Sequence, residues 1–183
     1  MHIPPELAAY CETSPVALAI SDADDDQQLR LINRRFTDLT GYGADAMLGR
    51  NCRLLQQDAD NVESRGRIRR FLADDTIANV RTTLLNFRLD GSPFVNLLYM
   101  SKLRDSGGRA RLVFASQFDV SRSQPEKLAA YDGALAATLG RMSPILAESG
   151  MIVDGSLITI GNSVATIAQA KLLLAGLSDA PLR

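Results

Sequence analysis

The feature that most constrains the fold is a series of three long strand-like segments in the middle of the chain. They are rich in β-branched and aromatic residues and cover residues 77–89, 94–104 and 109–120. The connections between them read "LDGS" and "DSGG", and Asp-Gly and Gly-Gly pairs favour tight hairpin turns. Because a short hairpin turn joins antiparallel neighbours, these segments predict a three-stranded antiparallel meander.

Two shorter strands are predicted ahead of the meander, at residues 15–22 and 29–33, separated by a polar turn. Between them and the meander, residues 34–42 and 61–75 carry apolar side chains at helical spacing. A further helix is expected at residues 4–12, after the Pro4-Pro5 pair. The pattern therefore predicts an α+β fold, a five-stranded antiparallel sheet with helices on one face.

The composition changes after Ser121, and the remainder is predicted to be a mainly helical extension. Residues 124–148 place Leu128, Leu135 and Met142 seven residues apart. We expect Ser143-Pro144 to interrupt this helix, because proline disfavours helical geometry at the preceding residue.

The last part of the extension is less clearly patterned. Residues 151–160 fit either a small hairpin closed at Asp154-Gly155 or a break between two helices, and 162–177 show helical spacing. Residues 156–177 have the length of a membrane span but contain Lys171. A lysine at the centre of a bilayer costs about 2.5–3.5 kcal/mol, so we expect no membrane insertion.

The overall composition excludes several functions. The net charge is −1 and the isoelectric point about 5.8, which gives no basic field for nucleic acid. His2 is the single histidine, so histidine-based triads and a phosphoacceptor histidine are not expected. Cys11 and Cys52 form neither a disulfide framework nor a CxxC metal site, and without a signal peptide we expect a cytoplasmic protein.

Polar side chains on apolar strand faces indicate a binding site. Asn96 shares a strand face with Leu98, and Gln117 and Asn86 are predicted to lie similarly on their own strands. A buried amide without a partner costs about 1–3 kcal/mol, so these amides pair either with backbone groups or with a flat heterocycle whose edge alternates C=O and N–H.

Arginines of the 61–75 helix add a possible anion site. Arg65 and Arg69 share one helix face, and a guanidinium can bind a phosphate through two parallel hydrogen bonds. For Arg65, Arg67 and Arg70 we favour a solvated, charged surface instead.

The stretch "GRNCRLLQ" (49–56) resembles the signature motif of LOV (light-oxygen-voltage) domains, the flavin-binding blue-light sensors of the PAS superfamily. "NRRFTDLTGYGADAMLG", "NFRLDGSPFVNLL" and "FASQFDVS" resemble other segments of that family in the same order. The resemblance covers residues 13–122, leaving an N-terminal cap helix (1–12) and a helical extension (123–183) that is expected to mediate dimerisation or signalling.

The resemblance implies roles residue by residue. Cys52 matches the photoactive cysteine and Gln117 the glutamine that faces flavin O4 and N5 and relays the signal. The other implied cofactor-binding residues are Asn51 and Gln56 for the ribityl chain, Arg53 and Arg69 for the FMN phosphate, Asn86 and Asn96 for the pyrimidine-like edge, and Leu98 beside them.

By this resemblance the chain is a blue-light photoreceptor rather than an enzyme. Illumination would form a reversible bond between Cys52 and flavin C4a, and rotation of the Gln117 amide would pass the change to the extension. The chain is similar to "short LOV" proteins, which implies FMN as cofactor and a homodimer through the C-terminal helices, with a further protein partner possible. A flavin-binding redox sensor and a ligand-free PAS interaction module are the alternatives.

Overall fold

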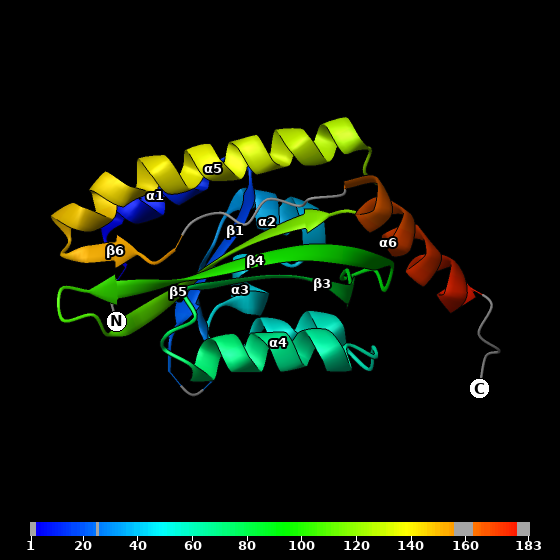
Figure 1. Ribbon diagram of the computed structural model, residues 1–183, viewed down its shortest axis with the longest axis horizontal. Coiled ribbons are helices and arrows are strands. Elements are labelled where there is room, and N and C mark those ends of the chain that lie inside the picture. The colour runs from blue at the N-terminus through cyan, green and yellow to red at the C-terminus, as the bar shows by residue number, and fades with distance from the viewer. Residues whose placement is uncertain (1–2, 25, 156–162, 179–183) are drawn as a thin grey trace.

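A computed structural model of the chain describes residues 3–24, 26–155 and 163–178. Its centre is an antiparallel sheet with the spatial order β2-β1-β5-β4-β3 (Figure 1). These strands are β1 (Ala17–Asp22), β2 (Leu29–Ile32), β3 (Asn79–Phe87), β4 (Pro93–Asp105) and β5 (Ala110–Asp119). The α+β class and the five antiparallel strands predicted from the sequence are thus confirmed.

The helices inserted between β2 and β3 pack on one face of this sheet. They are α2 (Arg34–Thr40), α3 (Ala44–Met47), the 3-10 helix η1 (Cys52–Gln56) and α4 (Val62–Ala73). Phe36, Met47 and Leu55 are fully or almost fully buried and pack with Ala17 and Ala19 of β1 in one core cluster. The alternation of side chains along a strand sends the next residues of β1 to the opposite face.

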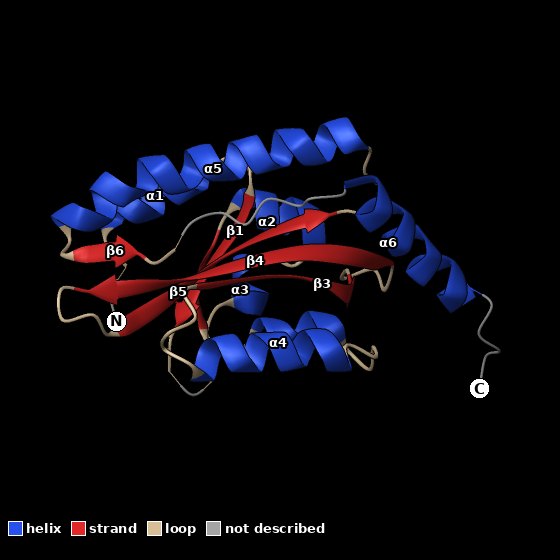
Figure 2. Cartoon of the chain, viewed as in Figure 1, coloured by secondary structure: helices blue, strands red, loops and turns tan. Residues whose placement is uncertain are grey.

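That opposite face is covered by α1 (Pro5–Thr13) and α5 (Pro125–Glu148), which lie together across the sheet from α4 (Figure 2). Leu18, Val95 and Tyr99 of the sheet are buried in the same cluster as Leu128 and Leu135 of α5. The seven-residue spacing of apolar side chains in the extension therefore reflects a helix that packs along the sheet. Helices consequently cover both faces once the extension is included.

The predicted interruption at Ser143-Pro144 is wrong, because α5 runs through Pro144 as one helix of 24 residues. Met142 and Leu146 on either side of the proline are fully buried. Burying a side chain of this size is worth about 1.5–3 kcal/mol, so the packing of both offsets the cost of a proline inside the helix.

A short sixth strand answers part of the open question about residues 151–160. β6 (Met151–Val153) pairs with Leu103–Asp105 of β4, just beyond Ser101, where the pairing with β3 ends. β6 therefore covers an edge of β4 that would otherwise be unpaired. The predicted hairpin closed at Asp154-Gly155 would continue into residues 156–162, which lie outside the described ranges.

The chain continues with α6 (Ser163–Ser178), which packs Ile167 and Ala170 into the main core cluster. Within the described ranges, no helix is both long enough and apolar enough to cross a bilayer.

Candidate functional site

A cavity of about 730 Å³ lies between the sheet and the η1–α4 side of the molecule. This volume is within the range of small-molecule and cofactor sites. All of the residues assigned to a site from the sequence line it: Asn51, Cys52, Arg53, Gln56, Arg69, Asn86, Asn96, Leu98 and Gln117. The fold brings them together from η1, α4, β3, β4 and β5.

The local backbone sets the position of Cys52. Gly49 has a φ of 76°, a left-handed conformation that glycine adopts without steric cost. Asn51 then caps η1, since its side chain accepts a hydrogen bond from the Arg53 backbone N–H at 2.9 Å. Cys52 is therefore the first residue of a capped helical turn at the cavity wall.

The environment of Cys52 keeps its sulfur protonated. Burial raises the pKa of the Cys52 thiol to about 12, because an apolar surrounding disfavours the charged thiolate. A cysteine that acts as a nucleophile in the ground state needs a lowered pKa. The site is thus poorly suited to ordinary thiolate chemistry.

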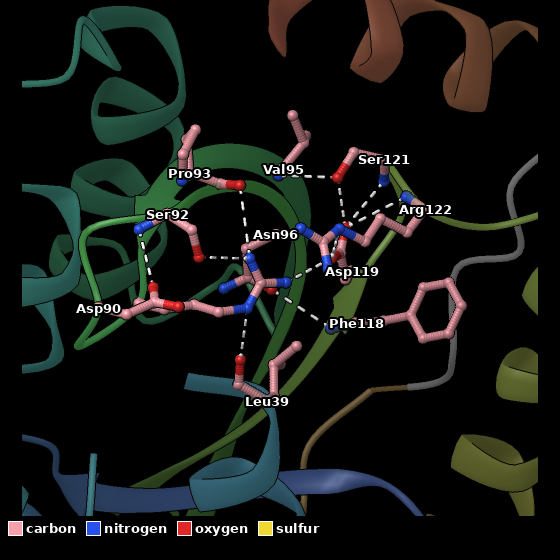
Figure 3. A network of polar contacts seen from close by, with 11 residues as sticks. Leu39, Asp90, Ser92, Pro93, Val95, Asn96, Phe118, Asp119, Ser121 and Arg122 are labelled. Atoms are coloured by element: carbon pink, nitrogen blue, oxygen red, sulfur yellow. Dashed lines mark hydrogen bonds and ion pairs between the residues drawn. The ribbon is translucent and has the colours of Figure 1, made fainter. Parts of the chain in front are cut away.

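Two of the predicted amides form a pair on neighbouring strands. Asn96 Nδ2 donates to Asn86 Oδ1 at 3.0 Å, and both side chains are almost fully buried. Asn96 Oδ1 also accepts a hydrogen bond from the Phe118 backbone N–H at 3.3 Å (Figure 3). This network fixes the orientation of the Asn96 amide beside the cavity.

Gln117 differs from this pair, because its buried side-chain oxygen Oε1 has no hydrogen-bond partner in the described part of the chain. Leaving a buried acceptor unpaired costs about 1–3 kcal/mol. Gln117 lines the cavity, so a ligand with a suitably placed donor would satisfy this oxygen.

The arginines lie on the η1–α4 side of the cavity. Arg53 forms an ion pair with Asp26 in the β1–β2 turn, and Asn51 Nδ2 donates to the Asp26 carbonyl oxygen at 2.5 Å. Arg69 and Arg65 line the cavity from α4, at adjacent turns of the helix.

The sequence-based interpretation of Arg65 as part of a solvated surface missed its contact with the site. Arg65 is exposed overall, yet its Nε donates to Gln56 Oε1 at 2.7 Å and it lines the cavity. The shared helix face of Arg65 and Arg69 was the available signal. Gln27 was also missed. It lines the cavity and has a φ of 44°, and it lies within the polar turn between β1 and β2, whose sequence has no distinctive pattern.

Taken together, the cavity suits a flat heterocyclic ligand with an anionic tail. Amides on β3, β4 and β5 can read alternating donors and acceptors on a ring edge, and arginines on η1 and α4 can bind phosphate. Among the described residues, no group of three or more His, Cys, Asp or Glu side chains is arranged to hold a metal ion.

Comparison with known proteins agrees with this geometry. Residues 15–122 match the PAS domain family. Blue-light-activated histidine kinase 2 of Erythrobacter litoralis is 34% identical over 153 residues, which cover 82% of this chain and 42% of that protein. The chain spans less than half the length of the first curated relatives it matches.

Solved structures extend the similarity to the whole chain. A LOV protein of Rhodobacter sphaeroides matches with a TM-score of 0.69 and 26% identity over 96% of both chains. The LOV domain of a blue-light activated histidine kinase from Erythrobacter litoralis matches with a TM-score of 0.54 and 33% identity, over 60% of this chain and 98% of that one. The chain therefore belongs to the PAS domain family and, within it, is a LOV domain with a C-terminal helical extension.

Proposed function

We propose that this chain is a blue-light receptor that holds a flavin, FMN, in the 730 Å³ cavity. The observation that carries the proposal is the unpaired Oε1 of Gln117 in the cavity that Cys52 and the Asn86–Asn96 pair also line. A buried amide left without a full set of partners at this position is explained by a ligand whose ring edge carries both acceptors and donors, since the amide can turn either its NH₂ group or its oxygen toward it. Relatives named as blue-light-activated proteins support the same function.

The residues present fit a flavin. Asn86, Asn96 and Gln117 offer both donors and acceptors to the ring edge, and Leu98 provides an apolar surface beside them. Asn51 and Gln56 would hold the ribityl chain, and Arg53 and Arg69 the phosphate. With arginines for one phosphate and no adenine site assigned, FMN is the flavin that fits best.

When bound, the flavin supplies the absorption of blue light and the carbon, C4a, with which the Cys52 sulfur can form a reversible bond. The protein holds the sulfur as a neutral thiol, because burial raises its pKa to about 12. The thiol therefore stays unreactive toward ordinary electrophiles in the dark, and its proton would go to the flavin nitrogen N5 when the bond forms.

Gln117 connects the cavity to the extension. Its amide can exchange the positions of its oxygen and NH₂ group, which have nearly the same shape. Gln117 lies two residues before Asp119. Asp119 forms an ion pair with Arg88 Nη2 at 2.6 Å and accepts a hydrogen bond from the Ser121 backbone N–H at 3.1 Å (Figure 3). A change at Gln117 therefore acts close to the point where the sheet ends and the extension begins.

The extension would carry the output as a change of conformation or of oligomeric state. Exposed apolar residues on α6, among them Val164, Leu172 and Leu173, suit association with another protein surface. A homodimer through the C-terminal helices is the association we propose. We assign no catalytic activity to this chain; the kinase activity in the names of some relatives belongs to proteins of which the matched segment covers 42% and 34%.

An absorption spectrum of the purified protein before and after blue light tests the function. We expect a flavin band in the blue that bleaches on illumination and recovers in darkness. A flavin band that never bleaches would favour a redox flavoprotein, and a colourless protein that takes up no added flavin would favour a ligand-free interaction module.

A further inference from the structure

A largely buried ion pair lies where β5 passes into the helical extension (Figure 3). Arg88 directly follows β3, and its Nη2 lies 2.6 Å from Oδ2 of Asp119, the last residue of β5. The two side chains are only 16% and 12% exposed, so solvent and salt screen this pair weakly. Neither residue is among those that line the 730 Å³ cavity.

The guanidinium of Arg88 is also held by groups of the sheet and of α2. Its Nε donates to the Leu39 carbonyl oxygen of α2 at 3.0 Å, and its Nη1 donates to Ser92 Oγ and to the Pro93 carbonyl oxygen, each at 3.4 Å. The guanidinium carbon also lies over the ring of Phe94, 4.5 Å from its centroid. Arg88 is therefore fixed to parts of the molecule that do not belong to the extension.

The carboxylate of Asp119 connects this fixed group to the turn that leads into α5. Its Oδ1 accepts hydrogen bonds from Ser121 Oγ and from the backbone N–H groups of Ser121 at 3.1 Å and Arg122 at 3.4 Å. Arg122 Nε lies 3.9 Å from Oδ2, but its side chain is 71% exposed, so this contact is weak. One planar carboxylate thus contacts the sheet through Oδ2 and the turn through Oδ1.

The two sides of this carboxylate differ in strength. The contact with Arg88 joins two opposite charges at 2.6 Å, whereas the turn offers uncharged donors. Only the first contact gains the attraction between two unit charges, which is strong away from bulk water. Gln117 lies two residues before Asp119 on the same strand, so a shift of β5 at the cavity would move Asp119. We expect the contact with Arg88 to be retained and the contacts with the turn to change.

We propose that Arg88 is a positioning residue for signalling, which holds Asp119 in place so that a change at Gln117 alters the turn at residues 120–124 and, through it, α5. The inference rests on the proposed function and deepens it, because it names the residue that makes β5 act on the extension. Without Arg88 the Asp119 carboxylate would move together with β5 and keep its contacts with the turn. The signal would then be lost between the sheet and α5, with the cavity unchanged.

Hydrogen exchange of the flavin-loaded chain, in the dark and under blue light, tests this role. In the original chain we expect light to speed exchange in the first turns of α5, residues 126–131, by about fivefold or more, as is typical of coupling between two sites. In Arg88→Met, which removes the charge but keeps an unbranched side chain, this light–dark ratio should fall below about twofold. The flavin band and the reversible bleaching should persist, because Arg88 lies outside the cavity.

Asp119→Asn is a milder second variant, because it keeps an acceptor for the turn but removes the charge that Arg88 holds. It should show the same loss of the light–dark ratio. Arg30→Met is the matched control, since Arg30 Nε also lies 2.6 Å from a carboxylate oxygen, that of Asp22, but on the edge strand β2. It should keep the ratio of the original chain.

The inference is overturned if Arg88→Met bleaches reversibly and keeps the original light–dark ratio. Exchange that rises by the same factor in the dark and in the light has this meaning too, because it marks a merely structural contact. If Arg88→Met does not retain flavin, Asp119→Asn decides by the same criterion. An equal loss in Arg30→Met, or an original chain that bleaches without any change in α5, also overturns the inference alone. An original chain that does not bleach would overturn the proposed function, and the inference with it.

Discussion

At the scale of single residues, Cys52 carries the most direct prediction. Cys52→Ala should bind flavin with little change in affinity but should lose the reversible bleaching, which absorption spectra in the dark and after illumination will measure. In the original chain the thiol pKa is raised to about 12 by burial, so the sulfur stays protonated well above the ordinary cysteine value of about 8.5. The extent of bleaching should therefore not increase as the pH is raised through that value. An increase there would mean that a thiolate reacts.

Replacing Gln117 should have different effects on the protein without flavin and with flavin. Its Oε1 is buried without a partner in the described part of the chain, so Gln117→Leu should leave the flavin-free protein as stable or stabilise it by up to about 1–3 kcal/mol. In the flavin-loaded protein the same change should weaken binding and abolish light-driven changes in the extension. Urea unfolding of both forms and hydrogen exchange in α5 will measure this; a clear loss of stability without flavin would show that the oxygen is already satisfied.

Much of the site could be predicted at this scale, and the reason lies in the residues themselves. Asn86, Asn96 and Gln117 are polar residues on strand faces whose other residues are apolar. This conflict with the local pattern can be recognised from the sequence alone. Arg65 has no such conflict, since an arginine on an exposed helix face is ordinary. Its place at the cavity depends on the contact with Gln56, which only the fold determines.

At the scale of elements, the packing of α5 on the sheet depends on Tyr131. Its hydroxyl lies 2.8 Å from Ser116 Oγ, and its ring stacks on Phe118 with centroids 4.5 Å apart. Ser116 and Phe118 flank Gln117 in β5, so Tyr131 contacts both neighbours of the proposed relay residue. Asp132, the next residue of α5, forms an ion pair with Arg81 of β3.

A double-mutant cycle can measure this attachment. Tyr131→Phe and Ser116→Ala should each lower the free energy of unfolding by about 1–3 kcal/mol, because each leaves one buried hydroxyl without its partner. The double variant should cost clearly less than the sum, with a coupling energy of about 1 kcal/mol in denaturant unfolding. Strict additivity would mean that the two hydroxyl groups do not depend on each other.

Pro144 shows where prediction of the elements failed. Local rules end a helix before a proline, but α5 continues because its buried residues on both sides of Pro144 are held by the sheet. β6 was equally hard to predict, since three residues acquire strand geometry only from the free edge of β4. Both features depend on contacts between segments far apart in the sequence, whereas hairpin turns are local and were predicted correctly.

Replacing this proline should stabilise the protein. Pro144 is exposed and lies inside α5, where proline removes a backbone hydrogen bond and crowds the preceding turn. We expect Pro144→Ala to raise the free energy of unfolding by about 1–3 kcal/mol, measured by urea denaturation. Ser143→Ala, at the neighbouring exposed position, is the control and should change it by less than about 0.5 kcal/mol; an unchanged or less stable Pro144→Ala protein would contradict the expectation.

At the scale of the whole molecule, α6 presents large apolar side chains to its surroundings. Leu172 is 73% exposed and Leu173 49%, on a helix that Ile167 and Ala170 anchor to the core. An exposed apolar face on an element attached to the sensor is suited to a contact that changes with the state of the cavity. A second copy of the chain would supply such a contact symmetrically.

Light scattering of the 183-residue chain after size-exclusion chromatography, in the dark and under blue light, tests the dimer. We expect a dimer in one of the two states and a shift toward monomer in the other. Replacing Leu172 and Leu173 together by glutamate should give a monomer in both states while leaving reversible bleaching intact, because both side chains lie outside the cavity. Lys171→Glu, which lowers the net charge by the same amount on an exposed neighbour, should keep the dimer. If the original chain is monomeric in both states, α6 does not signal through self-association, and its apolar face must serve a different partner.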